Sequence, residues 1–174
     1  QLSLESNSKL TVINISNVDV GEARDIGVRH AKNNYVLFLD SDCKLPNDFF
    51  LKLRQVLNEL SEEVVAIGGP VKGVESSSLV QKYLDYSIFS YFPHYEGEYI
   101  ASWNTFHKYH HPNMSNLLVR KDVFLEIGGC WKGKGEDVYY LLKITKLSYK
   151  IKYHPALMVY HYHPNSIFKL VRKY

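Results

Sequence analysis

The stretch "YVLFLDSDCKLP", residues 35–46, decides the prediction of the fold. Its five leading apolar residues are typical of a strand that is covered on both faces in a parallel sheet. Two aspartates, Asp40 and Asp42, follow this strand at once, and Pro46 ends the run. Because ligands of open α/β sheets bind beyond the carboxyl ends of the strands, both carboxylates are predicted to lie at a binding edge.

Strand and helix patterns alternate on both sides of this stretch. Residues 9–16 and 64–69 read as strands, while 21–33 and 47–60 carry apolar residues at helical spacing, with Asn47 as the expected N-cap. After them come a strand at 115–120, a short helix from 121 that Gly128 and Gly129 stop, a helix at 137–147, and strands at 149–154 and 157–162. The alternation predicts an α/β fold with a mostly parallel sheet flanked by helices.

Length and composition limit the class of protein. The 174 residues suit one domain, residues 1–174, and 45% hydrophobic with 22% charged residues is typical of a folded globular chain. The net charge of +3 comes without a dense basic run, so nucleic acid is not predicted as a partner. Cys43 and Cys130 read as free thiols in a reducing compartment, which favours the cytoplasm. No apolar run is long enough to span a membrane.

Two regions depart from the regular pattern. Residues 79–112 are crowded with Tyr, Phe, Trp and His, and read either as an amphipathic helix followed by an irregular packed loop or as a surface for a substrate. The basic tail at 164–174 reads either as a helix on a membrane surface or as a solvated terminal helix.

The two aspartates at the strand end suggest a metal. In an extended segment residues i and i+2 point the same way, so the carboxylates of Asp40 and Asp42 are expected to face one point. Two converging carboxylates repel each other unless a proton or a cation lies between them. A divalent metal with free positions for phosphate oxygens satisfies them, and solvated turn aspartates are the alternative.

Two later motifs also carry chemistry. Glu136 and Asp137 open a predicted helix, whose N-terminus stabilises anions and is expected to keep their pKa low, although capping alone explains acids there. His161 and His163 alternate on a late strand, so both rings lie on one face. Imidazole is a common ligand for divalent metals, and ordinary packing is the alternative.

The order of these motifs resembles the GT-A-fold family 2 glycosyltransferases, which use nucleotide-activated sugars. The resemblance runs from about Lys9 to the end of the chain. It rests on "GEARDIGVRHAKNNYVLFLDSD", "NMSNLLVRKDVFLEIGG", "GED" at a helix start, and "VYHYH".

The resemblance implies roles for the acids. Asp40 and Asp42 would hold Mn²⁺ or Mg²⁺ against the donor diphosphate, with His161 as the first choice for a further metal ligand. Asp137 would be the base that removes the proton of the acceptor hydroxyl, and Glu136 would hold the acceptor. In-line displacement with inversion, through a transition state with oxocarbenium character, would follow.

The resemblance also implies neighbouring residues. His163 is the second choice for the metal or diphosphate site, and Arg24 would lie near the donor, beside Asp25 where the family usually has Asn. Asn116 and Trp131 would lie on the acceptor side, where an indole ring can stack on a sugar face.

One departure from the family is expected to matter. The chain lacks the family's first βαβ unit, which carries part of the nucleotide site, and it does not open with Met, so it is expected to be a partial catalytic domain that is inactive alone.

The expected partners are a nucleotide-sugar donor, with a UDP-sugar favoured, and a saccharide or lipid-linked acceptor in polysaccharide or glycan synthesis. The expected place is the cytoplasm, at the inner face of a membrane.

Three other classes of protein share parts of this pattern. A phosphatase or hydrolase with Asp40 as nucleophile wants a hydroxyl residue where Lys44 stands. A His-rich metal-binding module has no spacing of a closed zinc site. A non-catalytic relative would keep the fold without needing all four acids.

Overall fold

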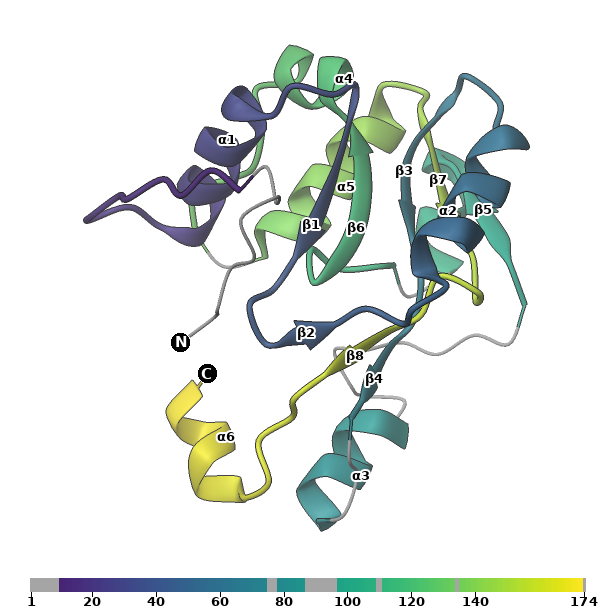
Figure 1. Ribbon diagram of the computed structural model, residues 1–174. Coiled ribbons are helices and arrows are strands. Elements are labelled where there is room, and N and C mark those ends of the chain that lie inside the picture. The colour runs from purple at the N-terminus through teal and green to yellow at the C-terminus, as the bar shows by residue number, and fades with distance from the viewer. Residues whose placement is uncertain (1–9, 75–77, 87–96, 109–110, 134, 174) are drawn as a thin grey trace.

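The computed structural model describes residues 10–74, 78–86, 97–108, 111–133 and 135–173 (Figure 1). Its helices are α1 Val20–His30, α2 Phe49–Asn58, α3 Leu79–Tyr86, α4 Lys121–Glu126, α5 Glu136–Lys146 and α6 Ile167–Lys173, with the 3₁₀ helix η1 Trp103–Lys108. Its strands are β1 Tyr35–Leu39, β2 Cys43–Lys44, β3 Val64–Gly68, β4 Val71–Gly73, β5 Tyr99–Ala101, β6 Asn116–Arg120, β7 Lys150–Tyr153 and β8 Val159–His161.

The strands form two sheets. A five-stranded sheet has the order β1-β6-β3-β7-β5, and a three-stranded sheet has the order β2-β8-β4. In Figure 1 the small sheet crosses below the large one, with α3 and α6 at the lower end. The predicted α/β class with flanking helices is confirmed.

The prediction of a mostly parallel sheet is wrong for the described strands. In the large sheet the β3–β7 pair is parallel, whereas the β1–β6, β3–β6 and β5–β7 pairs are antiparallel. The reason is the position of β6, which inserts between β1 and β3 and runs opposite to both. Alternation of strands and helices along a sequence does not reveal where a later strand inserts.

The first two strand predictions also need correction. β1 is an edge strand of the described sheet, and Tyr35 and Leu39 are exposed, so it is not covered on both faces. The central strand β3 is buried at every position instead. Residues 10–16 form no strand, because no described strand offers them backbone partners, and Leu10 and Val12 are exposed.

The core lies on both faces of the large sheet, and β6 shows why. Its side chains alternate, so that Leu117 and Val119 pack with residues of α1, α4 and α5, while Leu118 packs on the opposite face with residues of α2. Phe124 of α4 and Phe49 of α2 are almost fully buried, one in each layer. This double cover holds the carboxyl end of β1 in place.

The ends of the helices follow local sequence signals. Asp19 caps α1 by accepting a hydrogen bond from the Glu22 amide at 2.8 Å. After α4, Gly128 and Gly129 have φ values of 83° and 73°, which glycine adopts without a steric cost. The N-cap of α2 is Asp48 rather than Asn47, and its side chain makes no capping bond.

The aromatic region contains regular structure where it is described. α3 packs against β4, and β5 joins the large sheet beside β7, where the rings of Tyr99 and Tyr153 stack with centroids 5.0 Å apart. The predicted irregular loop is therefore wrong for residues 97–108, whereas 87–96 and 109–110 lie outside the described residues. The basic tail forms α6. Within the described part of the chain, every helix is too short or too polar to cross a bilayer.

Candidate active site

A turn follows β1 and separates the two aspartates. The Cys43 amide donates to the Asp40 carbonyl oxygen at 3.0 Å, so the chain bends at once into β2. The expectation of an extended segment is therefore wrong. Asp40 and Asp42 contact different partners. The surroundings of the first are called the Asp40 side, and those of the second the Asp42 side.

On the Asp40 side, three elements meet at the end of the large sheet. Arg24 of α1 lies 3.4 Å from Asp40 Oδ1 and makes a close ion pair with Glu136 of α5. Ser115 Oγ donates to Asp40 Oδ2 at 2.6 Å. The structure therefore brings together Arg24, Asp40 and Glu136 as predicted site residues. Sequence reasoning missed Ser115, because only the antiparallel pairing of β6 with β1 brings it there.

On the Asp42 side, the small sheet carries a chain of side chains. His161 Nε2 lies 3.2 Å from Asp42 Oδ1, and His161 Nδ1 lies 2.9 Å from His163 Nδ1. His163 Nε2 in turn lies 3.0 Å from Oδ1 of Asp85 on α3. The backbone fixes this order, because His161 pairs with Cys43 on β2 and with Gly73 on β4.

Asp85 is the residue on this side that sequence reasoning missed. Its signal was an acid on the amphipathic stretch "LVQKYLDY", which aromatic residues dominate. The structure buries Asp85 almost completely.

At the start of α5 the pKa of Asp137 is raised above the usual aspartate value. Burial is the main cause, and the negative charge of Glu136 adds to it, while a hydrogen bond from the Val138 amide and the charge of Arg24 oppose it. The sequence predicted a lowered pKa from the helix N-terminus, and this direction is wrong because burial outweighs that effect. A raised pKa brings a carboxylate closer to the range in which a general base works.

The loop before α5 presents an indole ring. Trp131 is 53% exposed, and its ring centroid lies 4.9 Å from that of Tyr139. Asp25 holds this loop, since the Cys130 amide donates to Asp25 Oδ1 at 2.8 Å, and a side chain on Gly129 would collide with the same carboxylate. Burial raises the pKa of the Cys130 thiol to about 12, so this thiol is not a reactive group.

Asn116 lies inside the protein rather than at the surface. Its side chain is almost fully buried, and its amide donates to the carbonyl oxygens of Leu157 at 2.6 Å and Pro70 at 3.3 Å. These two bonds tie β6 to the loops that lead into β8 and β4. The structure therefore gives Asn116 a role in holding the backbone and does not expose it to an acceptor.

Residues 7–174 match the family described as glycosyltransferase like family 2. The chain belongs to this family. The match covers nearly the whole chain and confirms the resemblance drawn from the four motifs. No curated protein matches the chain.

The fold of this family 2 chain resembles a solved mannosyltransferase. That protein is from Pyrobaculum calidifontis and its structure is in complex with GDP-Man and Mn²⁺. The TM-score is 0.57 at 17% sequence identity, and the match covers 88% of this chain. It covers 39% of the mannosyltransferase chain, so this chain spans well under half the length of that neighbour.

The residues on the Asp42 side fit a divalent metal with substrate ligands. Among the residues that the structure describes, no three His, Cys, Asp or Glu side chains gather closely enough to hold a metal by themselves. Asp42 and His161 supply two ligand atoms 3.2 Å apart. Mg²⁺ in phosphate-binding sites commonly takes one or two protein ligands and completes its shell with phosphate oxygens and water, so two protein ligands suffice.

The His-rich module has no support in the described histidines. His111 Nε2 lies 2.7 Å from the Phe106 carbonyl oxygen, and His154 lies 3.5 Å from Glu98. These histidines make local contacts of their own, and His110 lies outside the described residues.

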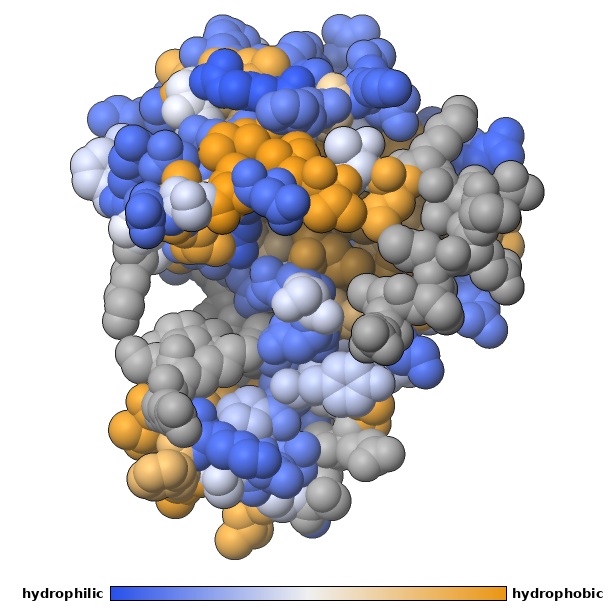
Figure 2. Space-filling view, turned by 60° about the vertical axis from the view of Figure 1, so that its left-hand side comes forward, coloured by the Kyte–Doolittle hydropathy of each residue, from blue (hydrophilic) through white to orange (hydrophobic). Residues whose placement is uncertain are grey.

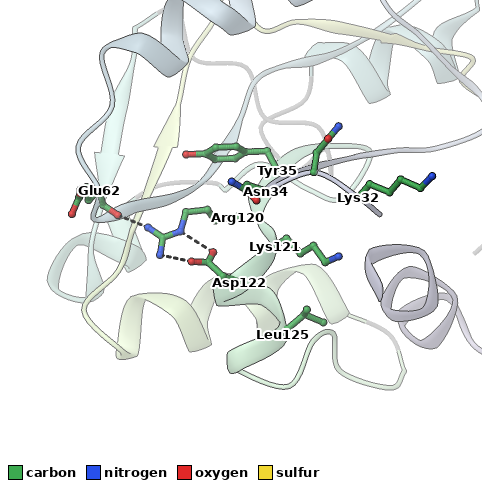
Figure 3. Close-up of a pocket in the computed structure, with 9 residues that line it drawn as sticks. Lys32, Asn34, Tyr35, Glu62, Arg120, Lys121, Asp122 and Leu125 are labelled. Carbon is green, nitrogen blue, oxygen red and sulfur yellow. Dashed lines mark hydrogen bonds and ion pairs between the residues drawn. The ribbon is translucent and has the colours of Figure 1, made fainter. Parts of the chain in front are cut away.

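A pocket at the other end of β1 is not part of this site. It has a volume of about 670 Å³ and is lined by residues that include Tyr35 and Arg120. Charged side chains that line it already contact other groups of the protein. Figure 3 shows this for Arg120, which donates hydrogen bonds to Asp122 and to the Glu62 carbonyl oxygen. Lys121 donates to the Ala31 carbonyl oxygen. The pocket therefore offers a ligand few uncommitted charges.

Proposed function

We propose that the chain is part of the catalytic domain of an inverting, metal-dependent glycosyltransferase. One observation carries the proposal: Arg24 connects the first aspartate of the D-x-D motif, Asp40, with the acid pair at the start of α5 through Glu136. Donor-side and acceptor-side acids from distant parts of the chain therefore meet at the carboxyl end of β1. Membership of the family supports the same conclusion.

The donor side uses the D-x-D motif. Asp42 and His161 would hold Mn²⁺ or Mg²⁺ together with Asp40, the second carboxylate of the motif, which Arg24 and Ser115 keep in place. When bound, the metal offsets the negative charge that develops on the leaving diphosphate. The sequence favours a UDP-sugar, whereas the solved neighbour holds GDP-Man, so both nucleotides enter the test.

The acceptor side uses the start of α5 and the loop before it. Asp137 takes the proton from the acceptor hydroxyl, and its raised pKa suits this role. Glu136 orients the acceptor from its ion pair with Arg24. Trp131 offers an exposed ring on which a saccharide can stack. Attack opposite to the leaving diphosphate inverts the anomeric carbon.

The test is sugar transfer, with Asp137→Asn as the decisive variant. We expect Mn²⁺-dependent binding of UDP or GDP by calorimetry, and transfer from the matching nucleotide-sugar. Asp137→Asn should keep nucleotide binding and lose transfer, because the amide cannot accept the proton. Asp48→Asn, the same change at an exposed ion pair on α2, is the matched control.

Two results of this test would contradict the proposal. Full transfer by Asp137→Asn would remove Asp137 from the mechanism. Binding of Zn²⁺ without any response to nucleotides would favour the metal-binding module instead. Binding is measured for this chain and for a version extended at its N-terminus, because β1 has an unpaired outer edge among the described strands.

The proposal includes peripheral association with the cytoplasmic face of a membrane, where a lipid-linked acceptor would lie. Ile167, Phe168 and Val171 of α6 are exposed, and Lys169 is exposed on the same helix. Figure 2 shows apolar side chains gathered at the lower end of the molecule, the height at which Figure 1 places α3 and α6. Apolar residues beside basic ones suit an anionic bilayer surface.

Liposome binding tests this association. Replacement of Ile167 and Phe168 by serine should reduce sedimentation with vesicles that contain phosphatidylserine and leave the nucleotide affinity unchanged. Replacement of Leu51, an exposed residue of α2, by serine is the control. Equal sedimentation of all three proteins would contradict a role for α6.

A further inference from the structure

Asp85 on α3 is a buried carboxylate whose described partners include a backbone amide and a histidine ring. Only 1% of its surface is exposed. Its Oδ1 accepts a hydrogen bond from the Gly73 amide at 2.6 Å and lies 3.0 Å from His163 Nε2. A buried carboxylate is costly unless hydrogen bonds and charges satisfy it, so these partners fix where Asp85 lies.

The position of Asp85 determines which nitrogen of His163 carries a proton. An ionised carboxylate only accepts hydrogen bonds, so His163 Nε2–H must donate to Asp85. In the neutral ring the other nitrogen, His163 Nδ1, is then an acceptor. It lies 2.9 Å from His161 Nδ1, so His161 Nδ1–H must donate to it.

The same reasoning continues to the candidate metal ligand. With its proton on Nδ1, the neutral ring of His161 turns the lone pair of Nε2 toward Asp42, 3.2 Å away. A carboxylate oxygen and an unprotonated nitrogen are both acceptors, and a cation between them satisfies both. The two hydrogen bonds therefore prepare His161 Nε2 as a metal ligand, as partners of ligating histidines do in known metal sites.

A second residue of α3 fixes the helix to the same segment. Gln81 lies one turn before Asp85, and its side-chain amide donates to the His163 carbonyl oxygen at 3.3 Å. α3 thus holds His163 through both its backbone and its ring. Of these two contacts, only that of Asp85 bears on the tautomer.

We propose that Asp85 is a positioning residue for the donor site: through His163, it fixes the tautomer and ring orientation of His161. This inference rests on the proposed function, in which His161 binds the metal. It also assigns α3, which opens the aromatic-rich region predicted at 79–112, to the donor side. Asp85 itself touches neither metal nor substrate.

The first test reads the tautomer directly, in metal-free protein. Long-range ¹H–¹⁵N spectra of ¹⁵N-histidine-labelled protein at a pH where the rings are neutral should show His161 protonated at Nδ1 and His163 at Nε2. In Asp85→Leu, His163 loses its acceptor, and His161 is expected to change to the Nε2–H form, which can donate to Asp42. Asp85→Asn should restore the wild-type pattern, because its amide oxygen accepts in the same place.

The second test measures metal affinity in the presence of UDP or GDP by Mn²⁺ electron paramagnetic resonance. Asp85→Leu should weaken Mn²⁺ binding by roughly 10- to 100-fold, as loss of an outer partner of a ligating histidine typically does. Asp85→Asn should bind nearly as well as wild type. Gln81→Ala removes the hydrogen bond from α3 to the His163 carbonyl oxygen and should leave the affinity unchanged. Circular dichroism confirms that each variant is folded.

The outcomes separate this inference from the proposed function. If wild-type His161 is protonated at Nε2 in the metal-free protein, the inference is overturned without any variant. It also fails if folded Asp85→Leu binds Mn²⁺ as tightly as wild type. If the wild-type protein shows the expected tautomers but binds no Mn²⁺ with either nucleotide, the proposed function fails and the hydrogen-bonded chain from Asp85 to His161 stands.

Discussion

Asp40 and Asp42 are two residues apart in sequence, yet the fold gives them opposite surroundings. Asp40 ends a strand of the large sheet and faces the permanent positive charge of Arg24 together with the hydroxyl of Ser115. Asp42 precedes a strand of the small sheet and faces an imidazole, which is neutral in its ordinary metal-binding form. One carboxylate therefore lies beside a guanidinium of the protein, whereas the other lies beside a side chain that can share a cation with it.

The two sides are joined by a buried amide. Asn116 stands beside Ser115 on β6 and binds the carbonyl oxygens of Pro70 and Leu157, which precede β4 and β8. Gly69 lies against the Leu157 carbonyl so closely that a Cβ would collide with it. The position of the Asp42 side relative to the Asp40 side therefore depends on a few tight backbone contacts.

The largest expected effect comes from removing the carboxylate that lies beside His161. Asp42→Ala should lower transfer by roughly 1,000-fold, because a Lewis-acid metal contributes several kcal/mol and about 1.4 kcal/mol is tenfold in rate. The ratio of nucleotide affinities with and without Mn²⁺ should fall to about one. Calorimetry and a transfer assay measure the two effects.

Asp40→Ala is the matched variant for this comparison. It should weaken nucleotide binding and keep part of the response to Mn²⁺, because Asp42 and His161 remain. Equal loss of the metal response in both variants would show that the two carboxylates act as one ligand set, and the distinction between the two sides would then be wrong.

An intermediate effect, on stability, should follow from removing the Asn116 amide that ties the Asp40 side to the Asp42 side. Asn116→Ala removes the side-chain donor to the Leu157 carbonyl oxygen and one of two donors to the Pro70 carbonyl oxygen, which the Val159 amide also contacts, so the free energy of unfolding should fall by about 1–3 kcal/mol. Urea unfolding followed by circular dichroism measures it. Asn33→Ala, at an exposed position, should change the stability far less. An unchanged stability in Asn116→Ala would mean that these bonds do not hold the sheets together.

The smallest expected effect is a shift in the pH profile of kcat/KM. Asp137 is active as a base only when deprotonated, so activity is lost as the pH falls through its pKa, which burial raises. Glu136→Gln removes a neighbouring negative charge and should move this acidic limb to lower pH. Arg24→Met removes a positive charge and should move the limb to higher pH. Shifts in the same direction, or none, would exclude Asp137 as the titrating group.

The parts of the fold that could be predicted rest on local signals. The spacing of apolar residues predicted α1, α2 and α5 to within a few residues of their observed ends. The double glycine predicted where α4 stops. Residues 10–16 have an equally good strand pattern and yet form no strand, because a strand also needs a neighbour. The prediction of parallel strands failed for a related reason, since β6 pairs with strands from distant parts of the sequence.

By itself, the sequence determined the family and the residues that meet at the carboxyl end of β1, because motif order and side-chain chemistry are properties of the chain. The tertiary structure alone decided their partners. Strand pairing brought Ser115 to Asp40 and His161 to Asp42, burial raised the pKa of Asp137, and the packing of α3 placed Asp85 behind His163. Those outcomes depend on contacts between distant segments and on exclusion of water, and neither is encoded in the spacing of nearby residues.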